Sequence, residues 1–158
     1  QAPEDERQRA LADIEGASLP MEVVDGVAHI HIQGLLLPNG AAWFRRWGAR
    51  ATDYLEIALM VHHAADDANV RSILLRVDSG GGFVRGISLA VDAVQAAREV
   101  KPVHTHTVGL MASCAYQIGC QAPRVSADRN ALAGSIGELL VLVDESKRMA
   151  EEGLEGGA

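Results

Sequence analysis

The chain has 158 residues, of which 48% are hydrophobic and 22% charged, and its formal net charge is −7. This size and composition fit one soluble globular domain, and because aromatic residues make up only 4%, its core must be built from Ala, Val, Leu and Ile. The acidic charge and the lack of a basic stripe argue against nucleic acid and an anionic membrane surface as partners. The apolar runs are far shorter than the roughly 20 residues of a membrane span, and the charged N-terminus differs from a signal peptide.

The beginning of the chain is charged and has a helical pattern. Residues 4–15 place Leu11 and Ile14 on one helical face. We therefore expect residues 1–20 to form a helical extension that packs on another subunit, and residues 21–158 to form the main domain.

Strand patterns come next. Residues 23–24 and 27–33 flank an Asp25-Gly26 pair typical of a hairpin turn. Residues 34–48 are rich in turn formers and contain both tryptophans. We predict a loop there, acting as a surface lid or a subunit contact.

The rest of the chain alternates between helical and strand patterns. This β-α-β order with short apolar strands predicts an α/β fold with a parallel sheet and β-α-β crossovers. In such sheets functional residues gather beyond the carboxyl ends of the strands. The predicted elements are a helix over 51–67, a strand over 72–77, a helix over 84–100, a strand over 103–108, a helix over 113–120, a strand over 124–127, a strand pair over 132–143 and a last helix from 144. In the first helix, the residues that recur at helical spacing are Leu55, Ala58, Leu59, His62 and Ala65.

Ser113 lies at a predicted strand-to-helix junction, with the small residues Ala112 and Ala115 around it. A serine there can point its hydroxyl out of the sheet as a nucleophile, while N–H groups at the new helix start face a developing oxyanion. The alternative is an N-cap serine, whose hydroxyl satisfies a helix N–H.

A glycine run, Gly80 to Gly82, follows the preceding strand. Three consecutive glycines permit positive φ and leave their N–H groups unshielded, whereas a plain turn needs only one glycine. If the two strands are neighbours, the run lies beside Ser113. The sequence therefore predicts a serine hydrolase with its nucleophile and oxyanion hole on adjacent loops, and a flexible turn stays the alternative.

Two other serines compete for the nucleophile role. Ser79, in Asp-Ser-Gly-Gly, matches the nucleophile loop of trypsin-like proteases, but those are all-β enzymes that need a His loop upstream, and we interpret the match as coincidence. Ser135 has no helix directly after it, so we expect it to shape a cleft wall or a turn.

Two histidine pairs share strand faces, His29 with His31 and His104 with His106. Two pairs could hold a metal, but no third ligand is evident. We interpret them as half-buried strand positions and predict neither a metal nor a cofactor.

The two cysteines, Cys114 and Cys120, lie six residues apart on one short predicted helix. Their side chains then point in different directions and do not bridge easily. We predict two small buried thiols rather than a disulfide.

Four motifs in order resemble one known family, the signal peptide peptidase A family of S49 serine peptidases. The motifs are Asp78-Ser-Gly-Gly-Gly-Phe-Val84, Lys101-Pro-Val103, Gly109-Leu-Met-Ala-Ser-Cys-Ala-Tyr116 and Leu132-Ala-Gly-Ser-Ile-Gly137. The resemblance covers about residues 23–153. It implies a ClpP/crotonase-like fold, and it is strongest to the phage and prophage branch, which is implicated in capsid maturation by cleaving scaffold or head proteins.

The resemblance also implies roles for individual residues. Ser113 would be the nucleophile, and Gly82 and Cys114 would donate backbone N–H groups to the oxyanion. The residues that would bind an extended peptide substrate are Gly80, Gly81 and Phe83 on one side and Leu132, Ala133, Gly134 and Ser135 on the other. This sequence departs from the family at two positions: Gly80 replaces a usual proline, and Cys114 replaces a usual glycine but keeps its N–H.

The general base implied by the family is a lysine in a segment after the last helix. Lys101 lies at the opposite end of its strand from Ser113, and Lys147 lies in a solvated helix start. A Ser-His-Asp triad would need a histidine after Ala127, where the sequence has none. We therefore expect the 158-residue chain to lack the lysine of a Ser-Lys dyad and to be inactive by itself.

The leading hypothesis is a serine endopeptidase that cleaves phage scaffold or capsid proteins, in the bacterial host cytoplasm or the procapsid. The alternatives are a crotonase-like acyl-CoA enzyme, which also uses two N–H groups as an oxyanion hole, and a non-catalytic structural or scaffold module of a phage head. Expected partners are a protein substrate and further copies of the chain in a homo-oligomer, without nucleic acid or membrane.

Overall fold

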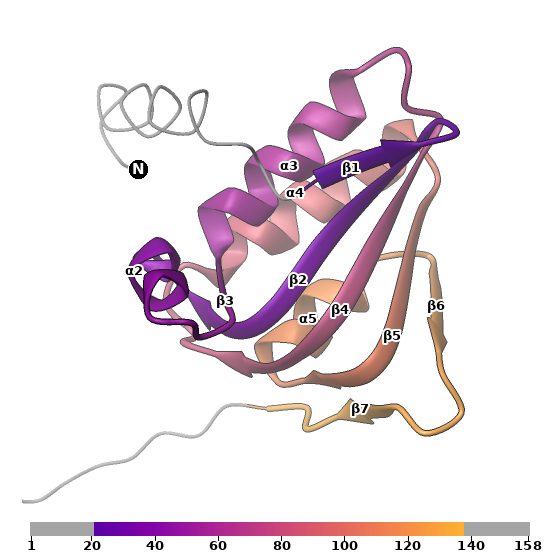
Figure 1. Cartoon of the computed structure of the whole chain (residues 1–158). Helices are drawn as coiled ribbons and strands as arrows, with labels where there is room; N and C mark the ends of the chain where they lie inside the picture. Colours follow the sequence, from indigo (N-terminus) through magenta and orange to yellow (C-terminus); the bar gives the residue numbers. More distant parts are fainter. Residues whose placement is uncertain (1–20, 138–158) are drawn as a thin grey trace, which may run out of the picture.

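One mostly parallel sheet dominates the computed structural model, which describes residues 21–137. Its strands are β1 (Met21–Val24), β2 (Val27–Leu37), β3 (Ala51–Asp53), β4 (Ser72–Gly82), β5 (Val103–Ala112), β6 (Arg124–Ala127) and β7 (Leu132–Gly134). The order across the sheet is β1-β2-β4-β5-β6, with β3 beside β2 and β7 beside β5. The β1–β2 hairpin is antiparallel and the other pairs are parallel (Figure 1).

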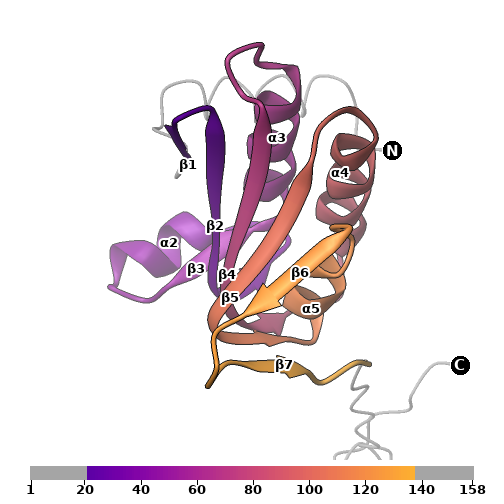
Figure 2. The same ribbon diagram turned by 90° about the vertical axis from the view of Figure 1, so that its right-hand side faces the viewer.

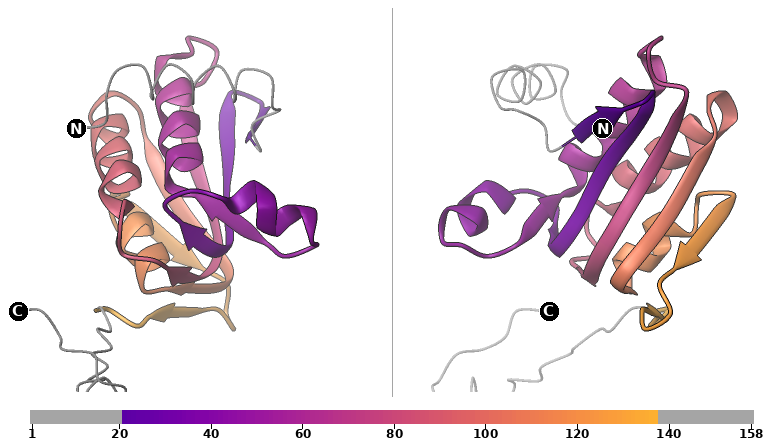
Figure 3. Two further views of the ribbon diagram at one scale, coloured as in Figure 1. Left: turned by 90° about the vertical axis from the view of Figure 1, so that its left-hand side faces the viewer. Right: turned by 45° about the vertical axis from the view of Figure 1, so that its right-hand side comes forward.

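Helices cover one face of this sheet. They are α3 (Tyr54–Asp66), α4 (Ile87–Val100) and α5 (Cys114–Gly119), while the short α2 (Ala41–Arg46) projects from the side of the molecule (Figure 2). The right-hand view of Figure 3 shows the strands of the other face without a covering helix among the described residues.

Buried and half-buried residues alternate along the strands, and this explains why helices cover only one face of the sheet. In β2, Ala28, Ile30 and Ile32 are fully buried, whereas the intervening His29 and His31 are half-buried on the open face. The buried residues of β2, β4 and β5 form one core with the inner sides of α3, α4 and α5. The predicted half-buried histidine positions are confirmed.

The predicted loop over residues 34–48 is wrong in two respects. Strand β2 continues to Leu37, and α2 forms within the segment. Gly34 explains why β2 continues through a segment rich in turn-forming residues. It lies at a register shift with φ +69, and a Cβ there would lie 1.9 Å from the Arg50 carbonyl oxygen. The strand thus bulges instead of ending.

Further element boundaries differ from the sequence-based expectation, beginning with β5, which was predicted to end at residue 108 and continues to Ala112. The predicted helix over 51–67 begins only at Tyr54, because residues 51–53 pair with the end of β2 as β3. The glycine run is not a turn after β4 but its last three residues, since Gly81 and Gly82 pair with β2. The predicted helix start at residue 84 is also wrong, because α4 begins at Ile87 after a left-handed Gly86.

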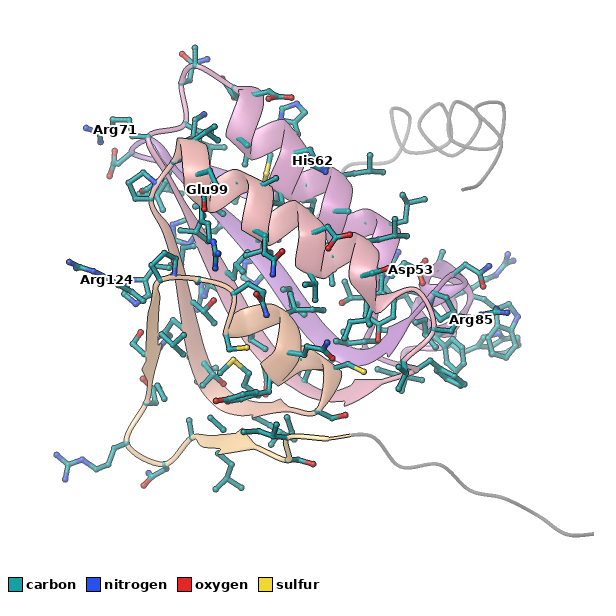
Figure 4. All side chains as sticks on the ribbon, turned by 180° about the vertical axis from the view of Figure 1, so that it is seen from behind. Asp53, His62, Arg71, Arg85, Glu99 and Arg124 are labelled. Atoms are coloured by element: carbon teal, nitrogen blue, oxygen red, sulfur yellow. The ribbon has the colours of Figure 1, made fainter. Side chains whose placement is uncertain are left out.

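Asp53 fixes the start of α3 and the position of α2. Its carboxylate accepts hydrogen bonds from the Ala41 N–H at 3.0 and 3.1 Å, and it forms a capping box with Glu56. Figure 4 shows Asp53 at this junction. A chain segment without apolar periodicity is therefore held in place by side-chain contacts.

The predicted extension over residues 1–20 and everything beyond residue 137, including the predicted last helix, lie outside the described residues. Among the helices that are described, none is long and apolar enough to cross a lipid bilayer.

Candidate active site

The carboxyl ends of β4 and β5 lie side by side at one edge of the sheet (Figure 1). Gly81 has φ +95, and a Cβ there would lie 2.8 Å from Ser113 Cβ and 3.0 Å from the Cys114 nitrogen. The glycine run and Ser113 therefore touch, and only glycine leaves room for this approach.

Ser113 has an unusual backbone for a residue that precedes a helix. Its φ of 52° and ψ of −125° lie in a region that glycine favours, and its hydroxyl makes no capping hydrogen bond. An N-cap serine has extended backbone and bonds a helix N–H, so the N-cap alternative does not describe Ser113. The strained conformation is typical of residues held for a function.

The N–H of Cys114 directly follows Ser113 in the chain. Within residues 21–137, the Cys114 N–H has no hydrogen-bond acceptor. Gly82 lies at the end of β4, where a Cβ would lie 1.9 Å from the Leu36 carbonyl oxygen, so no side chain fits. An anion bound beside Ser113 could therefore accept a hydrogen bond from the Cys114 N–H, and the donor role of Gly82 stays a prediction.

The remaining predicted substrate-binding residues flank Ser113 on both sides. Strand β7 runs along the end of β5, pairing Ala133 with Met111 and Gly134 with Ala112, and the Gly134 carbonyl accepts the Ser113 N–H at 3.2 Å. Leu132 is 70% exposed and Phe83 is 58% exposed. Gly80 is exposed beside Leu110, and Ser135 follows β7 with φ 51°.

Ser79 has a structural role that its resemblance to a nucleophile loop concealed. It is buried, its hydroxyl donates to the Gly34 carbonyl at 2.6 Å, and the same oxygen accepts the Gly81 N–H at 3.0 Å. The hydroxyl therefore ties the glycine run to β2 and is not free to attack a substrate.

Tyr54 is a further residue at the site that sequence reasoning missed, and the thiol of Cys114 makes a contact there in addition to the predicted role of its backbone. The Tyr54 hydroxyl donates to the Phe83 carbonyl at 2.5 Å, and the Cys114 thiol donates to the Gly82 carbonyl at 3.6 Å. Burial, and the neighbouring Cys114 thiol, raise the pKa of Tyr54 far above its usual value. The phenol is therefore a hydrogen-bond donor at any physiological pH.

The prediction of two buried thiols is half wrong. Cys114 is buried and Cys120 is exposed, and neither forms a disulfide. Cys120 ends α5 on its outer side, where the Gln117 carbonyl accepts its thiol proton.

Lys101 lies at the amino end of β5, and Ser113 follows the carboxyl end of the same strand. Its ammonium group donates to the carbonyls of Ala64 and Asp67 at 2.9 and 2.6 Å, which caps the last turn of α3. Lys147 lies outside the described residues.

The four histidines of the strands lie on the open face, away from Ser113. His104 and His106 both contact the Ser126 hydroxyl, at 3.1 and 2.9 Å, and His106 also faces Asp128. Burial and the nearby Arg76 lower the pKa of His31. A pocket on this face is lined by His31, Gln33, Arg76, Val77, Asp78, His106 and Val108. In the part of the chain that is described, no three His, Cys, Asp or Glu side chains are grouped to hold a metal ion.

Two phage proteins are similar to this chain in sequence, although no protein-family model matches it. Capsid assembly protease C of Escherichia phage lambda is 28% identical over 134 residues, which is 85% of this chain and 30% of the relative. Head-tail preconnector protein GP5 of Enterobacteria phage P21 is 28% identical over 137 residues, 84% of this chain and 26% of the relative. The chain thus spans less than a third of the length of either curated relative.

Solved structures with a similar fold are enoyl-CoA hydratases. An enoyl-CoA hydratase/isomerase family member matches with a TM-score of 0.57 and 17% identity, over 85% of this chain and 52% of that one. An enoyl-CoA hydratase from Mycobacterium avium subsp. paratuberculosis matches with a TM-score of 0.54 and 22% identity, over 73% and 46%. The predicted crotonase-like α/β fold is confirmed, and at these identities the likeness is one of fold alone.

Proposed function

We propose that this chain carries the serine nucleophile and the oxyanion hole of a peptidase that acts in phage head maturation. The observation that carries the proposal is the placement of Ser113, which has a strained backbone and an uncapped hydroxyl and packs against the glycine run. The adjacent Cys114 N–H has no acceptor within residues 21–137. The relative named a capsid assembly protease supports this class of activity. The four ordered motifs support the finer assignment to the S49 peptidases.

The proposed reaction is acyl transfer through Ser113. Its oxygen attacks the scissile carbonyl carbon while its proton passes to a base, and the resulting oxyanion accepts hydrogen bonds from the N–H groups of Gly82 and Cys114. Collapse of this intermediate breaks the C–N bond, and the amine leaves with the proton. Water then hydrolyses the acyl ester and restores Ser113.

The base in this proposal is a lysine, as the resemblance implies. Lys101 is the lysine within residues 21–137, and its hydrogen bonds at the far end of β5 remove it from consideration. In this proposal the dyad lysine lies outside residues 21–137.

The proposed substrate is an extended peptide of a scaffold or capsid protein. Strand β7 supports this, because it pairs with β5 along one edge and a peptide can add along its other edge. Phe83 would contact the peptide on the opposite side of Ser113. We further propose that the protein acts as a homo-oligomer, in the host cytoplasm or the procapsid.

A crotonase-like acyl-CoA enzyme is the second candidate, favoured by the fold of the solved structures. It would stabilise a thioester enolate with the same two N–H groups, but it would not need Ser113. The loss of activity on substitution of Ser113 therefore separates the two candidates.

The test is covalent labelling by a fluorophosphonate and peptide cleavage, in a form of the chain extended along its gene past Ala158. We expect Ser113→Ala to abolish labelling and to lower cleavage by on the order of 10⁶-fold, because the nucleophile is lost. Ser88→Ala, at an exposed position on α4, is the matched control and retains the parent rate.

Full activity of Ser113→Ala would show that another residue is the nucleophile. Turnover of a CoA thioester by both Ser113→Ala and the parent would favour the acyl-CoA enzyme. An extended chain that neither labels nor cleaves would favour the non-catalytic head module.

A further inference from the structure

We propose that Tyr54 is a positioning residue for the oxyanion hole, holding the peptides around Gly82 through its buried hydroxyl. The inference rests on the proposed function, because it assigns the hydroxyl a task in catalysis and not only in folding. No motif at the site includes Tyr54, which lies 29 positions before Phe83 and reaches it through the fold alone.

Tyr54 begins α3 and is fully buried beneath the end of β4. Its hydroxyl donates to the carbonyl of Phe83, and this fixes the peptide between Phe83 and Val84. The peptide before it is held at both ends, because the Gly82 carbonyl accepts the Cys114 thiol proton and the Phe83 N–H donates to Leu36.

The glycine run is held on its other side by Ser79. The Ser79 hydroxyl accepts the Gly81 N–H, and it donates to the Gly34 carbonyl of β2. The N–H of Gly82 belongs to the peptide between these two anchors. Its direction is therefore set by Ser79 on one side and by Cys114 and Tyr54 on the other.

Glycine makes these anchors necessary. Three residues without side chains have no packing that selects one backbone conformation, and the neighbouring Phe83 side chain is mostly exposed. Hydrogen bonds to the backbone are what remains to orient the peptides. The raised pKa of Tyr54 keeps its proton in place, so the phenol always donates and never repels the carbonyl.

Tyr54 also connects the two halves of the site. It lies beside the Cys114 thiol, and Cys114 carries the second proposed oxyanion donor on its backbone. A shift of this contact changes the spacing between the two N–H groups. Misplacement of a reacting group by about 1 Å costs about 100-fold in rate.

The test is Tyr54→Phe in the extended chain that cleaves peptide, since this change removes one oxygen and keeps the packing. We expect kcat to fall by roughly tenfold to 100-fold while KM changes less than about twofold, because the hole acts mainly in the transition state. Binding of a peptide aldehyde, which forms an oxyanion on Ser113, should weaken by a similar factor.

Two controls separate positioning from stability. Thr105→Val removes another buried hydroxyl, one that donates to the Gly119 carbonyl at 2.8 Å, and it should lower the melting temperature without lowering kcat. Tyr116→Phe makes the same chemical change at the other tyrosine of the chain and should leave both unchanged.

An unchanged kcat in Tyr54→Phe, or a loss confined to KM, would overturn the inference while the proposed function stands. If Thr105→Val lost as much kcat as Tyr54→Phe, the loss in Tyr54→Phe would be explained by lower stability, and the inference would also be overturned. If the parent protein is neither labelled by the fluorophosphonate nor able to cleave peptide, the proposed function is wrong, and this inference, which rests on it, is wrong as well.

Discussion

Ser113 is the residue at which stability and the proposed chemistry oppose each other. Its φ of 52° and ψ of −125° cost an L-residue about 1–3 kcal/mol, and glycine adopts them freely. The surrounding contacts, including the bond from its N–H to Gly134, maintain the conformation. The strained conformation leaves the Ser113 hydroxyl without a capping hydrogen bond, as the proposed nucleophile requires.

The strain predicts opposite effects for two substitutions of the same residue. We expect Ser113→Gly to be more stable than Ser113→Ala by about 1 kcal/mol, since glycine relieves the backbone strain and alanine keeps it. Urea unfolding of the two inactive variants measures the difference directly.

Ala96, an exposed residue in the interior of α4, provides the control for that comparison, because its parent side chain is already alanine. There the glycine variant should be the less stable by about 1 kcal/mol, as in any helix interior. If glycine were the less stable variant at both positions, the strain assigned to Ser113 would be wrong.

The sequence predicted that Ser113 and the glycine run lie side by side, and the structure places Gly81 against Ser113, while their roles in catalysis stay predictions. Ser113 and the glycines were visible because a serine between small residues and a triple glycine have few other uses. The string Asp-Ser-Gly-Gly around Ser79 matches a nucleophile loop, but the sequence did not predict a structural role for this serine. Only the fold shows that its hydroxyl is hydrogen-bonded to Gly34 and Gly81. The sequence did not indicate a role for Tyr54 at the site, since a tyrosine at an apolar helix start is typical of a core residue.

At the scale of elements, the β-α-β order was predictable because hydrophobic period separates strands from helices. The side of α3 that is buried could not be predicted in the same way. Of the residues predicted at helical spacing, Ala58 is buried, but Leu55 and Leu59 are only partly buried and His62 is exposed. The fully buried residues of α3 are Tyr54, Ile57, Met60, Val61 and Ala64. Apolar residues occur nearly all round this helix, so the sequence lacks the contrast that marks an inner face.

The segment between β2 and α3 depends on one side chain more than on its own composition. Asp53 accepts the Ala41 N–H at the start of α2 and caps α3. We expect Asp53→Ala to lower the free energy of unfolding by about 1–2 kcal/mol, because both helix starts lose their acceptor. Chemical denaturation measures this loss.

Asp53→Asn is the informative companion variant, because asparagine also caps helices well. It should keep most of the stability that alanine loses. Equal losses in the two variants would mean that the carboxylate acts through its charge, for example on Arg45, and not as a cap.

At the scale of the molecule, α2 presents an aromatic surface to the outside. Trp43 is 62% and Trp47 is 74% exposed, and Trp43 packs edge-on against Phe44 with ring centroids 5.1 Å apart. The surface is held rigidly, because Arg45 of the same helix forms a bidentate ion pair with Glu56 of α3. Rigid exposed aromatic side chains are typical of contact hot spots, since little entropy is lost when they are covered.

This surface supports the prediction of a subunit contact, which stays a prediction. If α2 joins copies of the chain, Trp43→Ser combined with Trp47→Ser should lower the mass measured by size-exclusion chromatography with light scattering, at unchanged protein concentration. Leu89→Ser, which removes an exposed apolar side chain from α4, is the control and should keep the parent's mass. A parent that is monomeric, or a double variant with the parent's mass, would contradict the assignment of α2 to the interface, and the two tryptophans would then be free to cover a substrate at the neighbouring end of the sheet.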